Sequence, residues 1–246
     1  DIILSPNPSY PIHPYGFIIA GASLRHLPAM NEGIFNPELY LERLENSIKD
    51  SVPAPVALIV SFPSNPTAQV VSLEFYKELV KIAIKYNVYI LSDLAYAEIY
   101  YDNVKPPSIL EVSRAKEVAV EFTSMSKTYA MAGWRIGFAV GNIKLINALT
   151  RIKSYLDYGA FTPVQVAAAA ALNGPQNCVE EIRNIYQKRR DILITSMARS
   201  GWDIPKPQAS MFAWAPLPEK YKSKGSLEFA KELMLKADVA VAPGVA

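Results

Sequence analysis

Polar residues of types that do chemistry follow three apolar runs of the sequence. Asn65 lies in a turn between two prolines after "VALIVSF", and Asp93 and Tyr96 lie three residues apart after "VYIL". Lys127 ends the stretch "SMSK" after "VAVEFT". A lysine amine can act as a nucleophile, a carboxylate as a charge partner, and a phenol and an amide as hydrogen-bond partners. Ligands of open α/β sheets bind beyond the carboxyl ends of the strands, so these four side chains are candidates for one site.

Phosphate-binding groups accompany the lysine. Ser124 and Ser126 precede Lys127, and Arg135 follows it by eight residues. Serine hydroxyls bind phosphate oxygens, and a guanidinium can do so through two parallel hydrogen bonds. The whole set is what a pyridoxal phosphate site requires. An amine forms a Schiff base with the cofactor aldehyde, a carboxylate keeps the pyridine nitrogen protonated, and a phenol and an amide hold the phenolic oxygen.

Each of these residues also has an ordinary structural role to weigh. Asp93 and Tyr96 could cap a helix or close a turn, Asn65 could be a turn residue, and Arg135 could form a structural ion pair. The sequence contains no G-x-x-x-x-G-K-[ST] loop, no G-x-G-x-x-G fingerprint, no G-x-S-x-G elbow and no His/Cys metal spacing. The joint occurrence of the polar residues at successive strand ends therefore favours the cofactor site, without a metal.

Short apolar runs alternate with segments of helical period over the first 141 residues. This alternation predicts βαβ units, hence an α/β fold with a mostly parallel sheet flanked by helices. The segment 72–87 has a helical stripe of apolar residues, and Ser72 is placed to cap it. The predicted strands are residues 17–21, 56–62, 88–93, 118–123 and 136–141.

The sequence after residue 143 is predominantly helical in pattern. Helices are predicted over 144–159, 162–174, 177–199 and 226–236, with two short strands around a Pro-rich turn in 201–218 and a strand in 239–243. The change from alternating strand and helix patterns to a mainly helical pattern predicts a large domain over 1–192 and part of a smaller α+β domain over 193–246.

Composition narrows the class of protein. The 246 residues include 25 basic and 23 acidic side chains, interspersed to a net charge of +2, and half of the residues are hydrophobic. We expect a globular protein that binds neither nucleic acid nor a membrane. The single cysteine, Cys178, has no internal partner for a disulfide, so a cytoplasmic location is expected. Both ends of the sequence interrupt apolar segments, which indicates a part of a longer protein.

Three stretches resemble a known family. "SNPTAQ", "SDLAYAEI" and "SMSKTYAMAGWRIGF" are similar to motifs of the fold type I, class I/II aminotransferases, which depend on pyridoxal phosphate. "NPSYPIHPYG", "FPSNPTAQVV" and "IKSYLDYGAFTPVQVAA" resemble the bacterial alanine (glutamate–pyruvate) subgroup and its aspartate aminotransferase-like relatives. The usual "NPTG" is here "NPTA", with Ala68 in the glycine position, as in that subgroup.

The resemblance implies roles for residues in or beside these motifs. It gives the Schiff base to Lys127, the pyridinium partner to Asp93, the phenolate contacts to Tyr96 and Asn65, and the phosphate contacts to Ser124 and Arg135. Ser126, beside them, is a further candidate for cofactor binding. Lys127, Asp93 and Tyr96 would be catalytic. Tyr10 would lie flat against the cofactor ring, and His13 would support Asp93. Tyr158 and Thr162 would reach the site of a neighbouring subunit in a homodimer.

The family resemblance also implies parts of the site outside this sequence. The glycine-rich phosphate loop, the N-terminal arm and a tyrosine donated across the dimer would precede Asp1, and the arginine for the substrate carboxylate would follow Ala246. The implied reaction is ping-pong transamination between an L-amino acid, with alanine favoured, and a 2-oxo acid such as 2-oxoglutarate. Aspartate or diaminopimelate-type transamination, a β-lyase or decarboxylase reaction, and a non-enzymatic sensor domain of a transcription regulator stay as alternatives.

Overall fold

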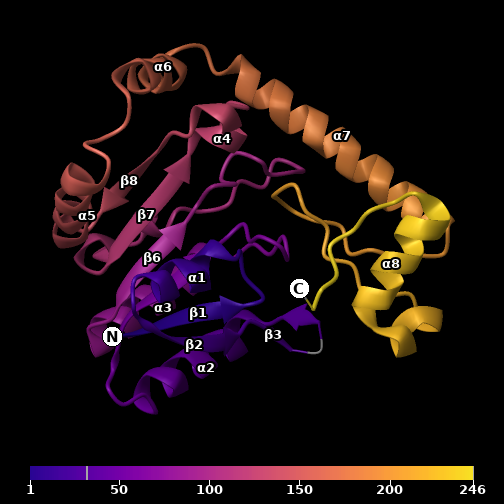
Figure 1. Ribbon diagram of the computed structural model, residues 1–246, viewed down its shortest axis with the longest axis horizontal. Coiled ribbons are helices and arrows are strands. Elements are labelled where there is room, and N and C mark those ends of the chain that lie inside the picture. The colour runs from indigo at the N-terminus through magenta and orange to yellow at the C-terminus, as the bar shows by residue number, and fades with distance from the viewer. Residues whose placement is uncertain (32, 246) are drawn as a thin grey trace.

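A six-stranded sheet organises the first part of the chain in the computed structural model, which describes residues 1–31 and 33–245 (Figure 1). The strand order is β2-β1-β5-β6-β7-β8. All neighbouring pairs are parallel except β7 with β8, which is antiparallel. The strands are β1 (Ile2–Asn7), β2 (Ser23–Pro28), β5 (Pro55–Ser61), β6 (Tyr89–Asp93), β7 (Ala119–Ser124) and β8 (Gly137–Gly141). A separate antiparallel pair joins β3 (Met30–Asn31) and β4 (Ile34–Phe35).

Helices cover both faces of this sheet. The main core lies under α2 (Pro37–Lys49) and α3 (Leu73–Tyr86), whose buried side chains pack on the apolar residues of β5 and β6. The helix α1 (Ile12–Ile19) covers the opposite face over a smaller cluster. Strands that are buried on both faces read as apolar runs in the sequence, which explains why β5, β6 and β7 could be predicted.

Helix α3 begins and ends at signals that the sequence contains. The Ser72 side chain accepts a hydrogen bond from the backbone N–H of Phe75 at 3.2 Å. Asn87 ends the helix in a left-handed conformation. The predicted helix over 72–87 and its cap are therefore confirmed.

The predicted strand over 17–21 is wrong, because these residues end α1 and the turn after it. A short apolar run can be a strand or a buried helix, and periodicity alone does not separate the two. Gly21 has a φ of 81°, and the N–H of Ala22 bonds to the carbonyl of Phe17. Glycine in this conformation is a common helix end. The strands β1 and β2 and the helix α2 were not predicted.

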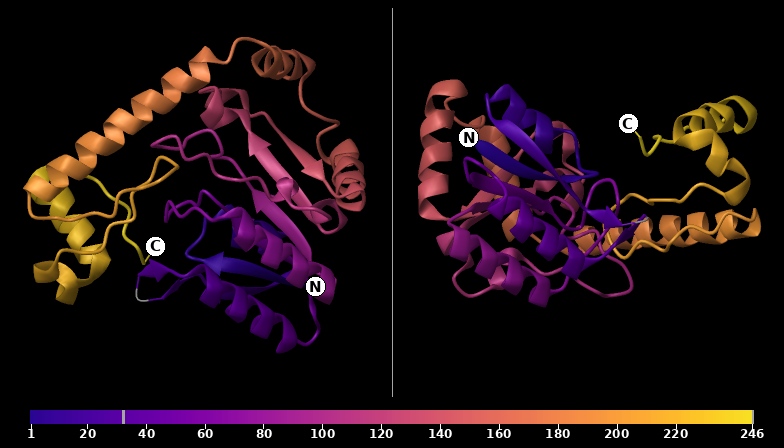
Figure 2. Two further views of the ribbon diagram at one scale, coloured as in Figure 1. Left: turned by 180° about the vertical axis from the view of Figure 1, so that it is seen from behind. Right: turned by 90° about the horizontal axis from the view of Figure 1, so that it is seen from below.

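The second part of the chain is helical, as predicted. It contains α5 (Ile143–Leu156), α6 (Thr162–Asn173), the long α7 (Asn177–Arg199) and α8 (Gly225–Ala237), preceded by the 3₁₀ turn η4 (Glu219–Lys224). Figure 2 shows α7 running from the sheet toward α8. The predicted domain boundary at 192 falls within α7 and stays a prediction.

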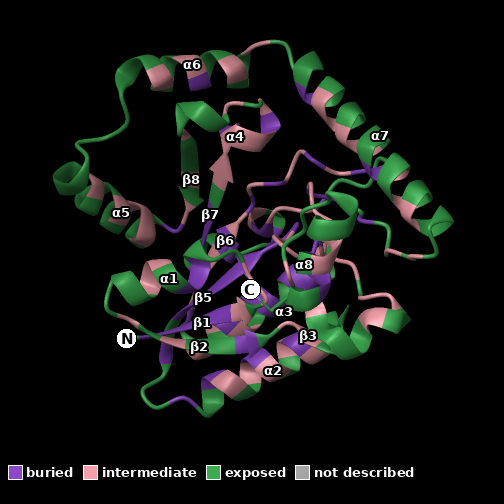
Figure 3. Cartoon of the chain, turned by 45° about the vertical axis from the view of Figure 1, so that its right-hand side comes forward, coloured by how far each residue is buried: buried purple, intermediate pink, exposed green. Residues whose placement is uncertain are grey.

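The strands predicted in 201–218 and 239–243 are wrong. Only an isolated bridge between Tyr100 and Ala209 forms there within residues 33–245. Pro205 and Pro207 have no N–H to donate to a ladder, and residues 239–243 are largely exposed without a neighbouring strand (Figure 3). Among the described residues, no helix is both long and apolar enough to cross a membrane.

Candidate active site

The carboxyl ends of four parallel strands bring most of the predicted site residues to one edge of the sheet. Asp93 ends β6, where it pairs in register with Ser61 of β5 and Phe122 of β7. His13 lies on α1, which follows β1, and Asn65 lies in the turn after β5. Because β8 runs antiparallel to β7, its first residue, Gly137, is opposite Ser124. Arg135 therefore also approaches this edge.

Asp93 is held at both of its carboxylate oxygens. The His13 Nε2 atom lies 2.9 Å from Oδ2, and the backbone N–H of Ala95 donates to Oδ1 at 3.0 Å. His13 is only 6% exposed, and its Nδ1 atom has no hydrogen-bond partner within residues 1–31 and 33–245. The tautomer that carries its proton on Nε2 satisfies the carboxylate. The Tyr10 ring meets His13 edge to face at 5.7 Å between centroids.

Tyr96 lies beside this carboxylate and stays protonated well above neutral pH. Burial, and then the negative charge of Asp93, raise the pKa of Tyr96 to about 12, while a hydrogen bond with the Asn65 side chain opposes the rise. A phenol in this state can donate a hydrogen bond to a ligand oxygen. The Phe212 ring packs on Tyr96 at 5.5 Å between centroids. The sequence pattern gave no signal for Phe212 beyond an apolar residue.

Ser124, Ser126 and Lys127 lie together at the start of the short helix α4 (Met125–Thr128). The Ser124 hydroxyl oxygen accepts a hydrogen bond from the backbone N–H of Ser126 at 3.1 Å. Arg135 follows the 3₁₀ turn η3 (Ala132–Trp134), has a φ of 51°, and donates from Nη1 to the carbonyl of Ala132 at 2.9 Å. These side chains are half-buried or exposed, so a ligand can reach them.

The predicted residues therefore form two groups at this edge of the sheet. In the first group His13 bonds to Asp93 and packs on Tyr10, and Tyr96 bonds to Asn65 and feels the charge of Asp93. The second group is Ser124, Ser126, Lys127 and Arg135 on the β7–β8 side. Within the described residues, no hydrogen bond or ion pair joins Lys127 or Arg135 to the first group. The backbone N–H of Leu94 donates to the carbonyl of Phe122 at 2.9 Å, which ties the two strand ends together.

This donor set fits pyridoxal phosphate. An anchored carboxylate suits the pyridine nitrogen, a protonated phenol with an amide suits the phenolic oxygen, and hydroxyls with a guanidinium suit the phosphate. The family model described as "Aminotransferase class I and II" matches residues 1–246. The chain belongs to the class I and II aminotransferases. The family is one of pyridoxal-phosphate-dependent enzymes.

Individual aminotransferases agree in sequence and in fold. "Glutamate-pyruvate aminotransferase AlaC" of Escherichia coli (strain K12) is 54% identical and covers 100% of this chain and 58% of its own length. "LL-diaminopimelate aminotransferase" of Moorella thermoacetica is 41% identical, covering 99% of this chain and 60% of its own length. The substrate-bound structure of BacF from Bacillus subtilis superposes with a TM-score of 0.85 at 34% identity, covering 99% of this chain and 60% of its own.

These comparisons confirm the predicted fold type I architecture. The chain spans about three-fifths of the length of the curated aminotransferases it matches, 58% and 60% of the two named above.

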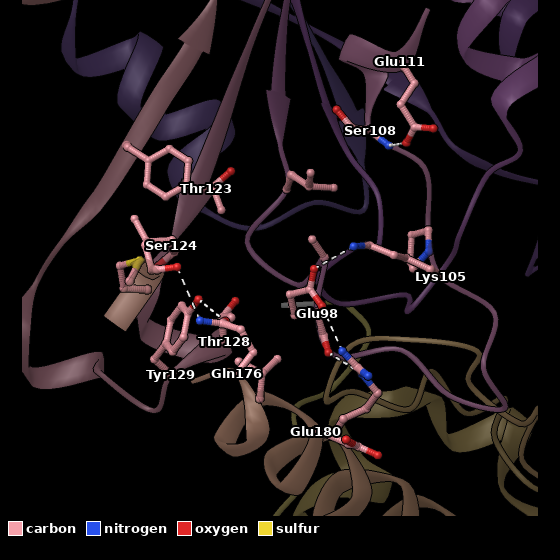
Figure 4. A pocket seen from close by; sticks show the side chains of 18 residues that line it. Glu98, Lys105, Ser108, Glu111, Thr123, Ser124, Thr128, Tyr129, Gln176 and Glu180 are labelled. Carbon is pink, nitrogen blue, oxygen red and sulfur yellow. Dashed lines mark hydrogen bonds and ion pairs between the residues drawn. The ribbon is translucent and has the colours of Figure 1, made fainter. Parts of the chain in front are cut away.

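A cavity of about 620 Å³ lies beside α4 in this aminotransferase chain, and it is not the predicted site (Figure 4). Ser124 lines it, but Lys127, Asp93 and Arg135 do not. Its far wall comes from α7 and from the loop after β6, where Glu98 bonds to Lys105 and to Arg183. Sequence reasoning singled out neither this loop nor its charged partners on α7.

Proposed function

We propose that this protein is a pyridoxal-phosphate-dependent aminotransferase that moves an amino group from an L-amino acid to a 2-oxo acid. The observation that carries the proposal is the Asp93 carboxylate, which is oriented by His13 and by the backbone N–H of Ala95. A carboxylate fixed in this way keeps an apposed pyridine nitrogen protonated. His13 acts through Asp93, and Tyr10 is positioned by its contact with His13.

The residues of the chain divide the work between holding the cofactor and moving a proton. When bound, pyridoxal phosphate supplies an electron sink for negative charge at the substrate Cα. Lys127 would hold the cofactor covalently, and its amine, when free, would move a proton to and from the substrate Cα. Tyr96 is protonated at neutral pH and donates to the phenolic oxygen together with Asn65.

The phosphate is assigned to the group on the β7–β8 side. Since the Ser124 oxygen accepts from the N–H of Ser126, its own hydroxyl hydrogen is available to a phosphate oxygen. Ser126 contributes a second hydroxyl. Arg135 uses one N–H for the Ala132 carbonyl, so its other donors can bind the phosphate.

Alanine with 2-oxoglutarate is the proposed substrate pair. The support is the 54% identity to a protein named glutamate-pyruvate aminotransferase, against 41% to one named LL-diaminopimelate aminotransferase. A homodimer is proposed as well, with Tyr158 and Thr162 reaching the partner's site. Tyr158 is 91% exposed and Phe161 is 75% exposed, as expected for a segment that another subunit covers. We also propose the division into a cofactor domain over 1–192 and a smaller domain from 193.

The replacement Lys127→Ala tests the cofactor assignment. The protein is titrated with pyridoxal phosphate, and the visible absorption band is recorded before and after removal of free cofactor. We expect a retained band in the wild type and no retained band in Lys127→Ala, because the covalent attachment is lost. Lys81→Ala, at an exposed position of α3, is the control and should keep the band. An unchanged band in Lys127→Ala would overturn the proposal.

The reaction and the substrate need a separate assay. A panel of alanine, glutamate, aspartate and diaminopimelate is tested as amino donors, with 2-oxoglutarate and with pyruvate as acceptors. We expect turnover to require an acceptor and to be fastest with alanine and 2-oxoglutarate. Turnover without any 2-oxo acid would instead indicate a lyase or decarboxylase.

A further inference from the structure

A buried arginine on α7 is hydrogen-bonded to the loop that follows Tyr96. Arg190 is 5% exposed. Its Nη1 and Nη2 atoms lie 2.9 Å from Oδ2 and Oδ1 of Asp102, and Nη1 also donates to the carbonyl of Pro207 at 3.0 Å. Its guanidinium lies over the ring of Tyr101 at 4.4 Å. Paired charge-assisted hydrogen bonds of this kind fix both distance and orientation.

A second arginine repeats the arrangement two turns earlier on the same face of α7. Arg183 bonds through Nη2 to the carboxylate of Glu98 at 2.9 Å and through Nε to the Glu98 carbonyl at 3.1 Å. Its guanidinium lies 3.9 Å from the ring centroid of Tyr100. Glu98 also pairs with Lys105 at 3.0 Å, and Figure 4 shows these two side chains at the cavity wall. The loop from 98 to 102 is therefore attached to α7 at both of its ends.

The same loop holds the segment 207–212 by its backbone. The N–H of Tyr101 donates to the carbonyl of Gln208 at 2.9 Å, and the N–H of Ser210 donates to the carbonyl of Ile99 at 2.8 Å. The Tyr101 hydroxyl donates to the carbonyl of Ser210. Two residues beyond Ser210, the Phe212 ring packs against Tyr96. A continuous chain of contacts thus leads from α7 to the phenol of the site.

We propose that Arg190, paired with Asp102, is a positioning residue that holds segment 207–212 against Tyr96 and so fixes the direction of the Tyr96 hydroxyl. The function of that hydroxyl rests on the proposed cofactor site, whereas the mechanical link does not. Asp102 takes a pair of bonds from Arg190 and the Pro207 carbonyl takes another. Arg190 is also paired with Asp191 on α7, so its charge stays paired when the bonds to Asp102 and Pro207 are weakened. The Pro207 carbonyl then loses its partner and the segment loosens.

The variants Arg190→Lys and Tyr101→Phe test the contacts that connect Arg190 with Tyr96, the first by a strong and the second by a mild disturbance. Arg190→Lys keeps the positive charge but loses the paired geometry. Tyr101→Phe keeps the ring under Arg190 and removes only the bond to Ser210, so it serves if the stronger variant does not fold. Lys206→Gln is the matched control, because it removes a neighbouring exposed charge that lies 3.3 Å from Asp102 and leaves the bonds from Arg190 and Tyr101 in place.

Two measurements on the protein without cofactor report how firmly segment 207–212 is held against Tyr96. Hydrogen exchange of peptides covering 99–102 and 208–212 should accelerate by on the order of tenfold in Arg190→Lys and less in Tyr101→Phe. Nitration of Tyr96, localised by mass spectrometry, should accelerate in the same order, because the phenol loses its cover. Peptides from β5, and the Lys206→Gln variant, should not change. Unchanged exchange or nitration in both variants would overturn the proposal.

A third measurement asks whether the link matters to the site. With pyridoxal phosphate bound, the pH midpoint of the visible band should rise by about half a pH unit in Arg190→Lys. The reason is that a loosened Tyr96 hydroxyl donates a weaker hydrogen bond to the phenolate oxygen of the cofactor. If hydrogen exchange were faster but the pH midpoint of the visible band were unchanged, Arg190 would only attach the loop to α7, and the positioning role would be overturned. Absence of any band in the wild type would instead overturn the proposed function, and nitration of Tyr96 would then decide the link.

Discussion

At the scale of single residues, the site is defined by groups whose partners are already in place. Asp93 has both oxygens bonded, and Tyr96 has a raised pKa of about 12. These features prepare one carboxylate and one neutral phenol at a fixed separation along β6 and the turn after it. Preorganised groups of this kind lose little free energy to reorganisation when a ligand binds.

Ala68 shows how the turn after β5 tolerates a departure from the family motif. Its φ is 55°, a left-handed conformation that costs a residue with a Cβ about 1 kcal/mol relative to glycine. Ala68→Gly relieves this strain but removes a buried methyl group and adds entropy to the unfolded chain. We expect a change in the free energy of unfolding within about 0.5 kcal/mol, measured by urea denaturation.

The matched control for this prediction is Ala83→Gly, at a fully buried position in the middle of α3. There the replacement loses helix propensity and a buried methyl group with no strain to relieve, so a loss of about 2 kcal/mol is expected. Equal losses at both positions would contradict the idea that Ala68 is strained.

At the scale of elements, the antiparallel strand β8 brings Arg135 to the edge where Lys127 lies. Gly137 pairs with Ser124, and a Cβ at Gly137 would lie 2.5 Å from the carbonyl oxygen of Thr123. Gly137→Ala must therefore push β8 away from β7 and shift Arg135, which precedes β8 by two residues. We expect a loss of about 1–3 kcal/mol in the free energy of unfolding and weaker retention of pyridoxal phosphate.

Gly133→Ala provides the comparison for this strand. A Cβ at Gly133 meets nothing within 4 Å, and it lies four residues before Gly137 in the connection to β8. Urea denaturation and cofactor titration should find this variant close to the wild type. If Gly137→Ala also matched the wild type, the close approach of β8 to β7 would not be what places Arg135.

The elements that the sequence predicted correctly are those whose pattern is local. Strands β5 to β8 are apolar runs, and α3 has its own cap at Ser72. The predicted positions of Asp93 and Ser124 followed, because a residue at the end of a parallel strand has its place fixed by the sheet. The misassigned segment 17–21 and the absent strands near 201–218 and 239–243 depend on tertiary neighbours, which decide whether an apolar run finds a partner strand.

The contacts made by α7 also lay beyond the sequence pattern. Arg183 and Arg190 fall within the helix predicted over 177–199. Arg183 bonds to Glu98 across 85 residues of sequence, and Arg190 bonds to Asp102 across 88. Charge pairs at such separations have no periodic signature in the sequence, so they can be identified only from the three-dimensional structure.

At the scale of the whole molecule, buried tyrosines make stability depend on alkaline pH. Burial raises the pKa of Tyr96 and Tyr101 to about 12 and raises the pKa of Tyr40 and Tyr76 as well. In the unfolded chain a tyrosine ionises near pH 10. The folded state therefore binds more protons above that pH, and the free energy of unfolding falls as the pH rises from about 10 toward 12.

Tyr76→Phe isolates one of these groups, because it removes the ionising hydroxyl and keeps the fully buried ring. We expect the slope of the unfolding free energy between pH 10 and 11 to become shallower by about 1 kcal/mol per pH unit, because the unfolded tyrosine is only partly ionised over this interval, measured by urea denaturation at intervals of pH. Tyr155→Phe, at a position that is 77% exposed, should keep the slope of the wild type. The same slope in all three proteins would mean that the Tyr76 phenol titrates alike in the folded and unfolded states, and the core around α2 and α3 would then admit water.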